Sequence, residues 1–130
     1  MKKLTFALIV VLLSGCSMIA PKYDNNEYKL LVSLEVDSRL LVKDCSDPQL
    51  VQHRLKHMVN TSELFFTYTF YIPHNDDTYE MAKILRTNIN ELKERYSQES
   101  PPSKFYCGIK SKILIESTQR ALEAVGSKVE

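Results

Sequence analysis

The sequence predicts an all-α protein, a small antiparallel four-helix bundle tied by one disulfide. Three observations favour this fold. Apolar residues recur at three- and four-residue spacing in four segments, which is typical of amphipathic helices. Breaks at Asp47-Pro48, at Pro73 and at Ser100–Ser103 separate those segments. After residue 15 the only glycines are Gly108 and Gly126, which argues against tight hairpins and phosphate-binding loops.

The first helix is expected from Glu27 to just before Cys45. Its apolar stripe consists of Leu30, Leu31, Leu34 and Leu41. The second helix is expected to begin at Asp47, a candidate N-cap that is followed by Pro48 at the first helical position. Its stripe consists of Val51, Leu55, Met58, Val59, Phe65 and Phe66. Residues 66–72 also alternate and are rich in β-forming side chains, so a strand competes there. The helix is preferred because no pairing strand is apparent.

The third helix is expected after Pro73, where Asn75, Asp76 and Asp77 are all candidate N-caps. Asp77 and Glu80 also have the spacing of a capping box, with Asp in place of the usual Ser or Thr. Its stripe consists of Met81, Leu85, Ile89, Leu92 and Tyr96. The fourth helix is expected after Ser103, with Gly126 as its C-terminal cap. Its inward residues are expected to be Ile109, Ile113, Leu114, Ala121, Leu122 and Val125. The short connections favour an up-down-up-down bundle.

The beginning of the chain has the three-part layout of a secretory signal peptide. Lys2 and Lys3 precede an apolar run over residues 4–13, and two small residues follow. The run has about ten residues, whereas a helix needs about twenty to cross a bilayer. An alternative is an ordinary secretory precursor that is cleaved near Ala20.

The end of this run, Leu13-Ser14-Gly15-Cys16, resembles the lipobox of bacterial lipoproteins. The resemblance implies cleavage before Cys16 and lipidation of its thiol, so the chain would contact the membrane through a lipid anchor. Ser17, where an Asp would imply retention in the inner membrane, implies the outer membrane, with the domain facing the periplasm. The expected organisation is a signal peptide at 1–15, a lipidated tether at 16–26 and a helical domain at 27–130.

The remaining cysteines, Cys45 and Cys107, form an even pair in a chain directed to an oxidising compartment. We therefore expect them to form a disulfide. In the predicted bundle both lie in links at the same end, which is consistent with a bridge. Two unpaired thiols or a redox pair are the alternatives, and a redox pair would lack the Cys-x-x-Cys spacing.

Composition and motifs limit the possible partners and chemistry. Removing Lys2 and Lys3 from 17 basic residues leaves 15 against 16 acidic ones, so no nucleic-acid partner is implied. His53 and His57 have the spacing of two metal ligands on a helix, but no third ligand lies near them in the sequence. We interpret them as a solvated polar face, with His74 in an exposed loop. No metal, cofactor or catalytic residue is expected, because the chain contains no recognisable catalytic or phosphate-binding motif.

One group of aromatic residues is a candidate contact surface. The group consists of Phe65, Phe66, Tyr68, Phe70, Tyr71 and the later Tyr79. The first five lie in the second predicted helix, which must either bury all of these rings or leave one face for a partner. Burial in the core is the preferred interpretation.

Location, size and the lack of catalytic motifs favour a non-enzymatic accessory module that binds another envelope protein. One version resembles the pilotins of secretion systems, although no pilotin motif is found residue by residue. Another is a phage- or plasmid-encoded exclusion or lysis lipoprotein. An envelope enzyme, or an inhibitor of a cell-wall enzyme, is the alternative from a different class.

Overall fold

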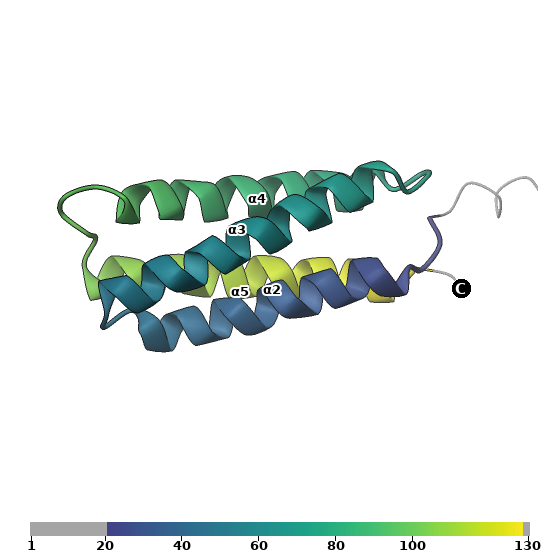
Figure 1. Ribbon diagram of the computed structural model, residues 1–130. Helices are drawn as coiled ribbons and strands as arrows, with labels where there is room; N and C mark the ends of the chain where they lie inside the picture. Colours follow the sequence, from purple (N-terminus) through teal and green to yellow (C-terminus); the bar gives the residue numbers. More distant parts are fainter. Residues whose placement is uncertain (1–20, 129–130) are drawn as a thin grey trace, which may run out of the picture.

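The computed structural model describes residues 21–128, which form an antiparallel bundle of four helices (Figure 1). Helix α2 lies against α3 and α5, and α4 completes the bundle by lying against α3 and α5. This confirms the predicted fold class. The helices are α2 (Asn25–Asp44), α3 (Pro48–Phe70), α4 (Asp76–Tyr96) and α5 (Lys104–Gly126).

Side chains that bond to exposed backbone N–H groups determine where three of the helices begin. The Asp24 carboxylate accepts hydrogen bonds from the backbone N–H groups of Asn26 and Glu27, so α2 starts two residues before the predicted position. The predicted cap of α3 is confirmed, because Asp47 accepts from the N–H of Gln49. Ser103 caps α5 in the same way. Each such cap stabilises a helix by about 1 kcal/mol.

One predicted capping box, one predicted C-terminal cap and one alternative are wrong. The N-cap position of α4 is Asn75, one of the three predicted candidates, so Asp77 lies inside the helix and does not form a capping box. Gly126 is the last residue of α5, and the cap position is Ser127, so no positive φ is needed there. The strand considered for residues 66–72 is also excluded, because α3 remains helical to Phe70.

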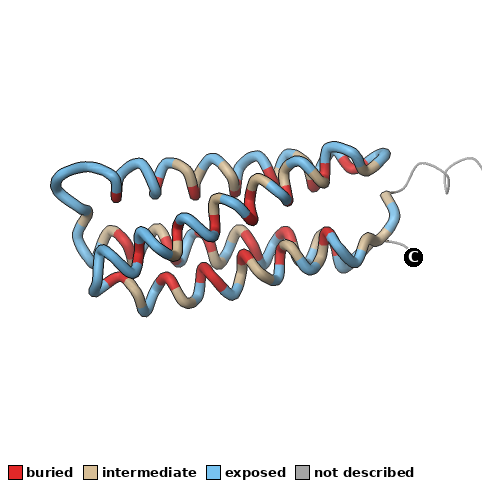
Figure 2. The backbone as a smooth tube through the Cα atoms, in the orientation of Figure 1, coloured by how far each residue is buried: buried red, intermediate tan, exposed pale blue. Residues whose placement is uncertain are grey.

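The core runs along the inner faces of all four helices (Figure 2). Most of the predicted stripes of α2, α3 and α4 are buried in it, with Leu30, Val59, Phe66 and Met81 packed at its edge. Its fully or almost fully buried apolar residues are Leu31, Leu34, Leu41, Val51, Leu55, Met58, Phe65, Ala82, Leu85, Ile89, Leu92, Tyr96, Leu114, Ala121 and Val125.

The disulfide joins the start of α5 to the end of α2. Cys45 and Cys107 are bridged, with their Cα atoms 5.6 Å apart. Cys107 is completely buried, and the Ser111 hydroxyl next to the bridge donates to the Cys107 carbonyl oxygen at 2.8 Å. The predicted pairing is therefore confirmed, together with its position at one end of the bundle.

The register of α5 differs from the prediction. Ile109 and Ile113 were expected to point inward, but they are 44% and 43% exposed. Because Cys107 must face the core to reach Cys45, Ile109 lies about 200° further round the helix and points outward. The buried face of α5 instead consists of Cys107, Ser111, Leu114, Thr118, Ala121 and Val125.

The opposite end of the bundle is held by buried polar groups. Lys128 lies 2.7 Å from the carboxylate of Glu27, whose side chain is completely buried. The side-chain amide of Asn75 donates to the same carboxylate at 2.6 Å and accepts from Lys128. This network joins the start of α2, the link between α3 and α4, and the end of α5.

None of the described helices has the length and apolarity that a membrane span requires.

Candidate interaction surfaces

The outer face of α5 carries a row of large apolar side chains, which we name the α5 stripe. It consists of Phe105, Ile109 and Ile113, which are 78%, 44% and 43% exposed. Their four-residue spacing places them on one side of the helix over two turns. The apolar spacing of the sequence predicts Ile109 and Ile113 in the core, and Phe105 is not among the predicted inward residues.

The inward face of α5 includes two hydroxyl-bearing side chains beside its apolar residues. Ser111 and Thr118 are completely buried. Their hydroxyl groups donate to the backbone carbonyl oxygens of Cys107 and Leu114, four residues earlier, at 2.8 and 2.9 Å. These bonds satisfy the hydroxyls without help from another helix. Helix α5 therefore buries polar side chains while it exposes larger apolar ones.

Three lysines lie beside the α5 stripe in the first half of the helix. Lys104, Lys110 and Lys112 occur within the same turns of α5, and the first acidic residue of the helix is Glu116. Among residues 21–128, none of these three lysines forms an ion pair with a carboxylate. Lys110 instead lies over the ring of Tyr106, 5.7 Å from its centre. The surface is thus apolar with a basic border.

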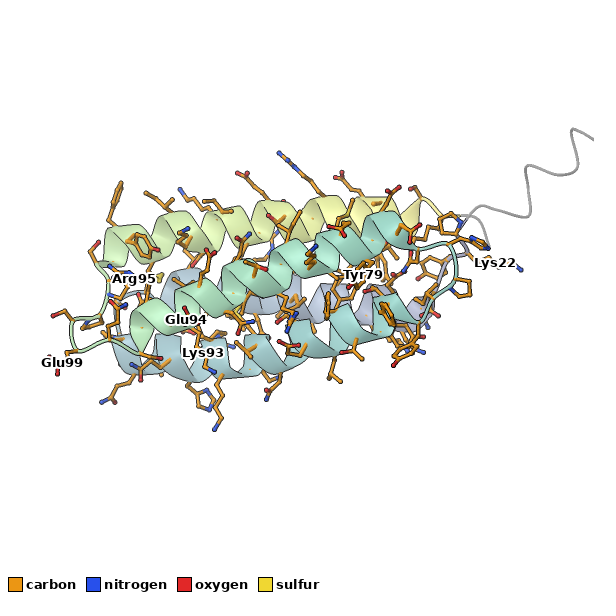
Figure 3. The ribbon with its side chains drawn as sticks, turned by 90° about the horizontal axis from the view of Figure 1, so that it is seen from above. Lys22, Tyr79, Lys93, Glu94, Arg95 and Glu99 are labelled. Carbon is orange, nitrogen blue, oxygen red and sulfur yellow. A yellow bond between two sulfur atoms is a disulfide. The ribbon has the colours of Figure 1, made fainter. Side chains whose placement is uncertain are left out.

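The aromatic residues that the sequence grouped together do not act as one surface. Phe65 is completely buried in the core. The Tyr68 hydroxyl donates to the Asp24 carboxylate at 2.9 Å, which fastens the end of α3 to the start of α2. Phe66 packs against Tyr79 of α4, with ring centres 5.0 Å apart; Tyr79 is labelled in Figure 3. The preferred interpretation, burial in the core, therefore describes Phe65 but not every member of the group.

Phe70 and Tyr71 form a second exposed apolar surface, which we name the aromatic tip. They are 63% and 76% exposed and meet edge to face, with ring centres 5.2 Å apart. Phe70 also contacts Tyr79, at 5.7 Å between ring centres. The aromatic tip ends α3 at the point where the chain turns through His74, which has a φ of 58°.

Hydrogen bonds favour the ionised form of Asp24, which lies at the same end of the bundle as the aromatic tip. Burial acts to raise the pKa of this carboxyl group. Bonds from the N–H groups of Glu27 and Asn26 and from the Tyr68 hydroxyl favour the ionised form, with a further contribution from the positive charge of Lys128. Together they hold the pKa of Asp24 below its ordinary value.

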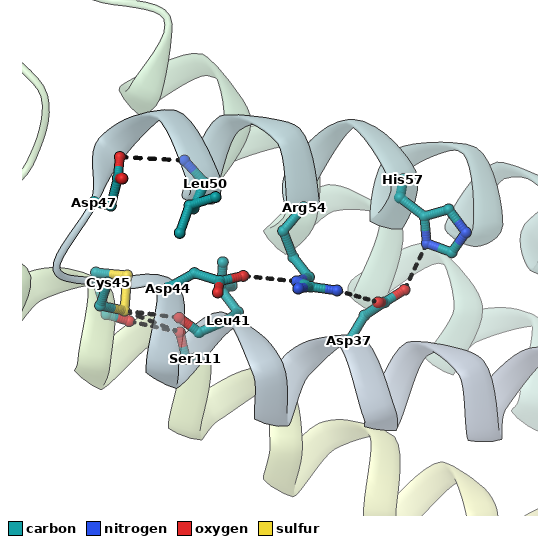
Figure 4. A network of polar contacts seen from close by, with 10 residues as sticks. Asp37, Leu41, Asp44, Cys45, Asp47, Leu50, Arg54, His57 and Ser111 are labelled. Atoms are coloured by element: carbon teal, nitrogen blue, oxygen red, sulfur yellow. Dashed lines mark hydrogen bonds and ion pairs between the residues drawn. A yellow bond between two sulfur atoms is a disulfide. The ribbon is translucent and has the colours of Figure 1, made fainter.

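A charged network connects α2 to α3 (Figure 4). Arg54 donates to Asp44 at 2.7 Å and to Asp37 at 3.2 Å. The bond to Asp44 is the main cause of the raised pKa of Arg54, and Asp37 adds to it against the effect of burial. His57 lies with its Nδ1 atom 2.7 Å from the other Asp37 oxygen. The network fixes how α2 and α3 lie against each other.

The histidines are not brought together into a metal site. His57 is paired with Asp37, and His53 remains exposed on α3. Within residues 21–128, no group of three His, Cys, Asp or Glu side chains has an arrangement that could hold a metal ion.

Cys16 and the signal segment lie outside the described residues.

Comparison of the chain with protein-family models, curated protein sequences and solved structures finds no match.

Proposed function

We propose that this chain is a lipid-anchored outer-membrane protein that faces the periplasm and uses the α5 stripe to bind another protein of the cell envelope. Support for the anchor comes from the sequence before Cys16. Support for binding comes from one observation above all, the exposure of Phe105, Ile109 and Ile113 along one side of α5.

The composition of α5 favours a protein contact over a solvated surface. Burying one large apolar side chain contributes about 1.5–3 kcal/mol relative to leaving it in water. Helix α5 lacks part of this stabilisation, because it buries Ser111 and Thr118 and leaves the α5 stripe exposed. A partner that covers the stripe would recover it, with Phe105, the most exposed residue of the three, as the natural anchor.

The chemistry around the stripe defines the partner. A straight row of side chains at four-residue spacing fits the apolar face of a second helix, since such faces repeat with the same period. Lys104, Lys110 and Lys112 have no carboxylate partner among the described residues, so acidic side chains beside that face would complement them. The proposed partner therefore presents an amphipathic helix whose apolar face is flanked by Asp or Glu.

A photo-crosslinking residue at Ile109 tests this contact in native envelopes. We expect it to capture one protein at a helical segment with acidic flanks, and we expect Lys112→Glu to abolish capture. The matched control is the same crosslinker at Val36, which is 47% exposed on α2. Equal capture from both positions, or capture that Lys112→Glu does not affect, would contradict the proposed contact.

The lipid anchor needs a separate test. Replacing Cys16 with Ser removes the only thiol that the lipobox resemblance assigns to lipidation. The variant should therefore leave the membrane fraction, while the unaltered protein should remain in it. An unchanged membrane fraction for Cys16→Ser would show that the anchor is wrong, whatever the crosslinking result.

A further inference from the structure

We propose that the aromatic tip, Phe70 and Tyr71, inserts into the lipid interface of the membrane that holds the anchor. This inference rests on the proposed lipidation of Cys16 and adds a second point of membrane contact. The two contacts together would hold the bundle with its long axis away from the membrane surface, so that the α5 stripe lies near the end far from the membrane.

The aromatic tip and the beginning of the described chain lie at the same end of the bundle (Figure 1). Tyr68, three residues before Tyr71, bonds to Asp24 at 2.9 Å. Asn75, four residues after Tyr71, bonds to Glu27 at 2.6 Å. Lys22 extends from the same end (Figure 3). The disulfide lies at the other end, where α2 finishes and α5 begins.

The tether between Cys16 and the described chain can span only a short distance. Pro21 follows Cys16 by only five positions, and a fully extended chain of that length reaches at most about 18 Å. A lipidated Cys16 would thus hold this end of the bundle close to the membrane surface. The gap could not hold two layers of helix, each about 10–12 Å across. Lipid is therefore a better occupant than a folded protein partner.

The side chains of the aromatic tip are suited to the lipid interface. Phe70 and Tyr71 are 63% and 76% exposed, and Ile72 and Pro73 continue the apolar run. Tyrosine suits the boundary between lipid and water, because its ring is apolar while its hydroxyl can remain hydrated. Asp76 and Asp77 follow at the start of α4, so we expect a zwitterionic lipid surface, with no requirement for anionic lipid.

The experiment uses a tryptophan reporter in the lipidated protein, whose sequence contains no other tryptophan. Tyr71→Trp is reconstituted into phosphatidylethanolamine and phosphatidylcholine vesicles with brominated acyl chains, which quench tryptophan on contact. We expect a blue shift and a loss of emission at position 71. The matched control is Phe105→Trp, which replaces a similarly exposed residue at the far end of the bundle, and it should keep its emission.

Each outcome decides a different claim. Unquenched emission from the Tyr71→Trp variant in its vesicle-bound form would overturn the inference and leave the lipid anchor intact. A blue shift in native envelopes without quenching in brominated vesicles would also overturn it, in favour of a protein contact. Vesicle binding that is unchanged by Cys16→Ser would show instead that the proposed anchor has failed.

Discussion

At the scale of single residues, polar side chains determine how the ends of this bundle are closed. Glu27 is a fully buried carboxylate, and such a group costs several kcal/mol unless it is paired and hydrogen-bonded. Lys128 forms the ion pair with this carboxylate, and the side-chain amide of Asn75 donates a hydrogen bond to it. Since these residues come from three separate segments, the network forms only when α2, α5 and the link between α3 and α4 are all in place.

Asp24 gives a residue-scale prediction with a defined pH dependence. Asp24→Ala should lower the free energy of unfolding by about 1 kcal/mol at neutral pH, because α2 loses its N-cap. The folded-state pKa of Asp24 lies below the ordinary value of 3.8. Its stabilising contribution is therefore complete above that value and is lost as the pH falls through the lowered pKa.

Urea unfolding of the two proteins between pH 7 and pH 2 measures this effect. The difference between them should shrink as the pH falls below 3.8. Asp24→Asn is the control, because an asparagine keeps the capping oxygen but cannot ionise. A difference between Asp24→Ala and the natural protein that stays constant down to pH 2 would contradict the assigned role of the carboxylate.

At the scale of elements, α5 is the helix whose sequence and packing disagree most. Large apolar residues occur on both of its sides, so its apolar pattern does not define a single inward face. The inner side is defined by Cys107, Leu114, Ala121 and Val125, and the outer side carries the α5 stripe. Two neighbouring residues allow this register to be tested directly.

Leu114→Ala should lower the free energy of unfolding by about 2–5 kcal/mol, because it opens a cavity in the core. Leu114 is only 2% exposed. The same truncation one residue earlier, Ile113→Ala, should change stability by less, within about 1 kcal/mol, since 43% of that residue is already in water. Urea titration of both variants with the disulfide intact makes the comparison. Equal losses would mean that α5 is rotated relative to the described register.

At the scale of the whole molecule, the disulfide and the buried polar network close opposite ends of one bundle. The bridge joins residues 62 positions apart and holds α2 to α5 beside the link that leads into α3. Glu27, Asn75 and Lys128 hold the other end. The molecule thus has one end fastened covalently and one end, beside the aromatic tip, fastened by hydrogen bonds and charge.

Cys45→Ser combined with Cys107→Ser should lower the free energy of unfolding by about 4 kcal/mol, because a loop of this length gains entropy in the unfolded state. Thermal or urea unfolding of the double variant measures the loss. Addition of a reductant is the control: it should destabilise the natural protein towards the same value and leave the double variant unchanged. Equal stability of the oxidised protein and the double variant would contradict the prediction.

Local patterns in the sequence are enough to predict the four helices, their order and the disulfide. Apolar spacing marks α2, α3 and α4 because most of their buried apolar residues recur at three- and four-residue intervals. Asp47-Pro48 marks the start of α3 because proline tolerates only the first turn of a helix. An even pair of cysteines after Cys16 is enough to predict the bridge between Cys45 and Cys107.

Contacts between helices select which side of α5 faces inward and which aromatic residues are buried. A helix with apolar residues on two sides can satisfy local spacing in either register, and the constraint that selects one of them comes from α2, through Cys45. The sequence did contain a signal: once Cys107 is assigned to a bridge, residues two positions away must point outward. The division between Phe65 in the core and Phe70 and Tyr71 at the tip depends in turn on where α4 covers α3, a contact that spacing along one helix does not encode.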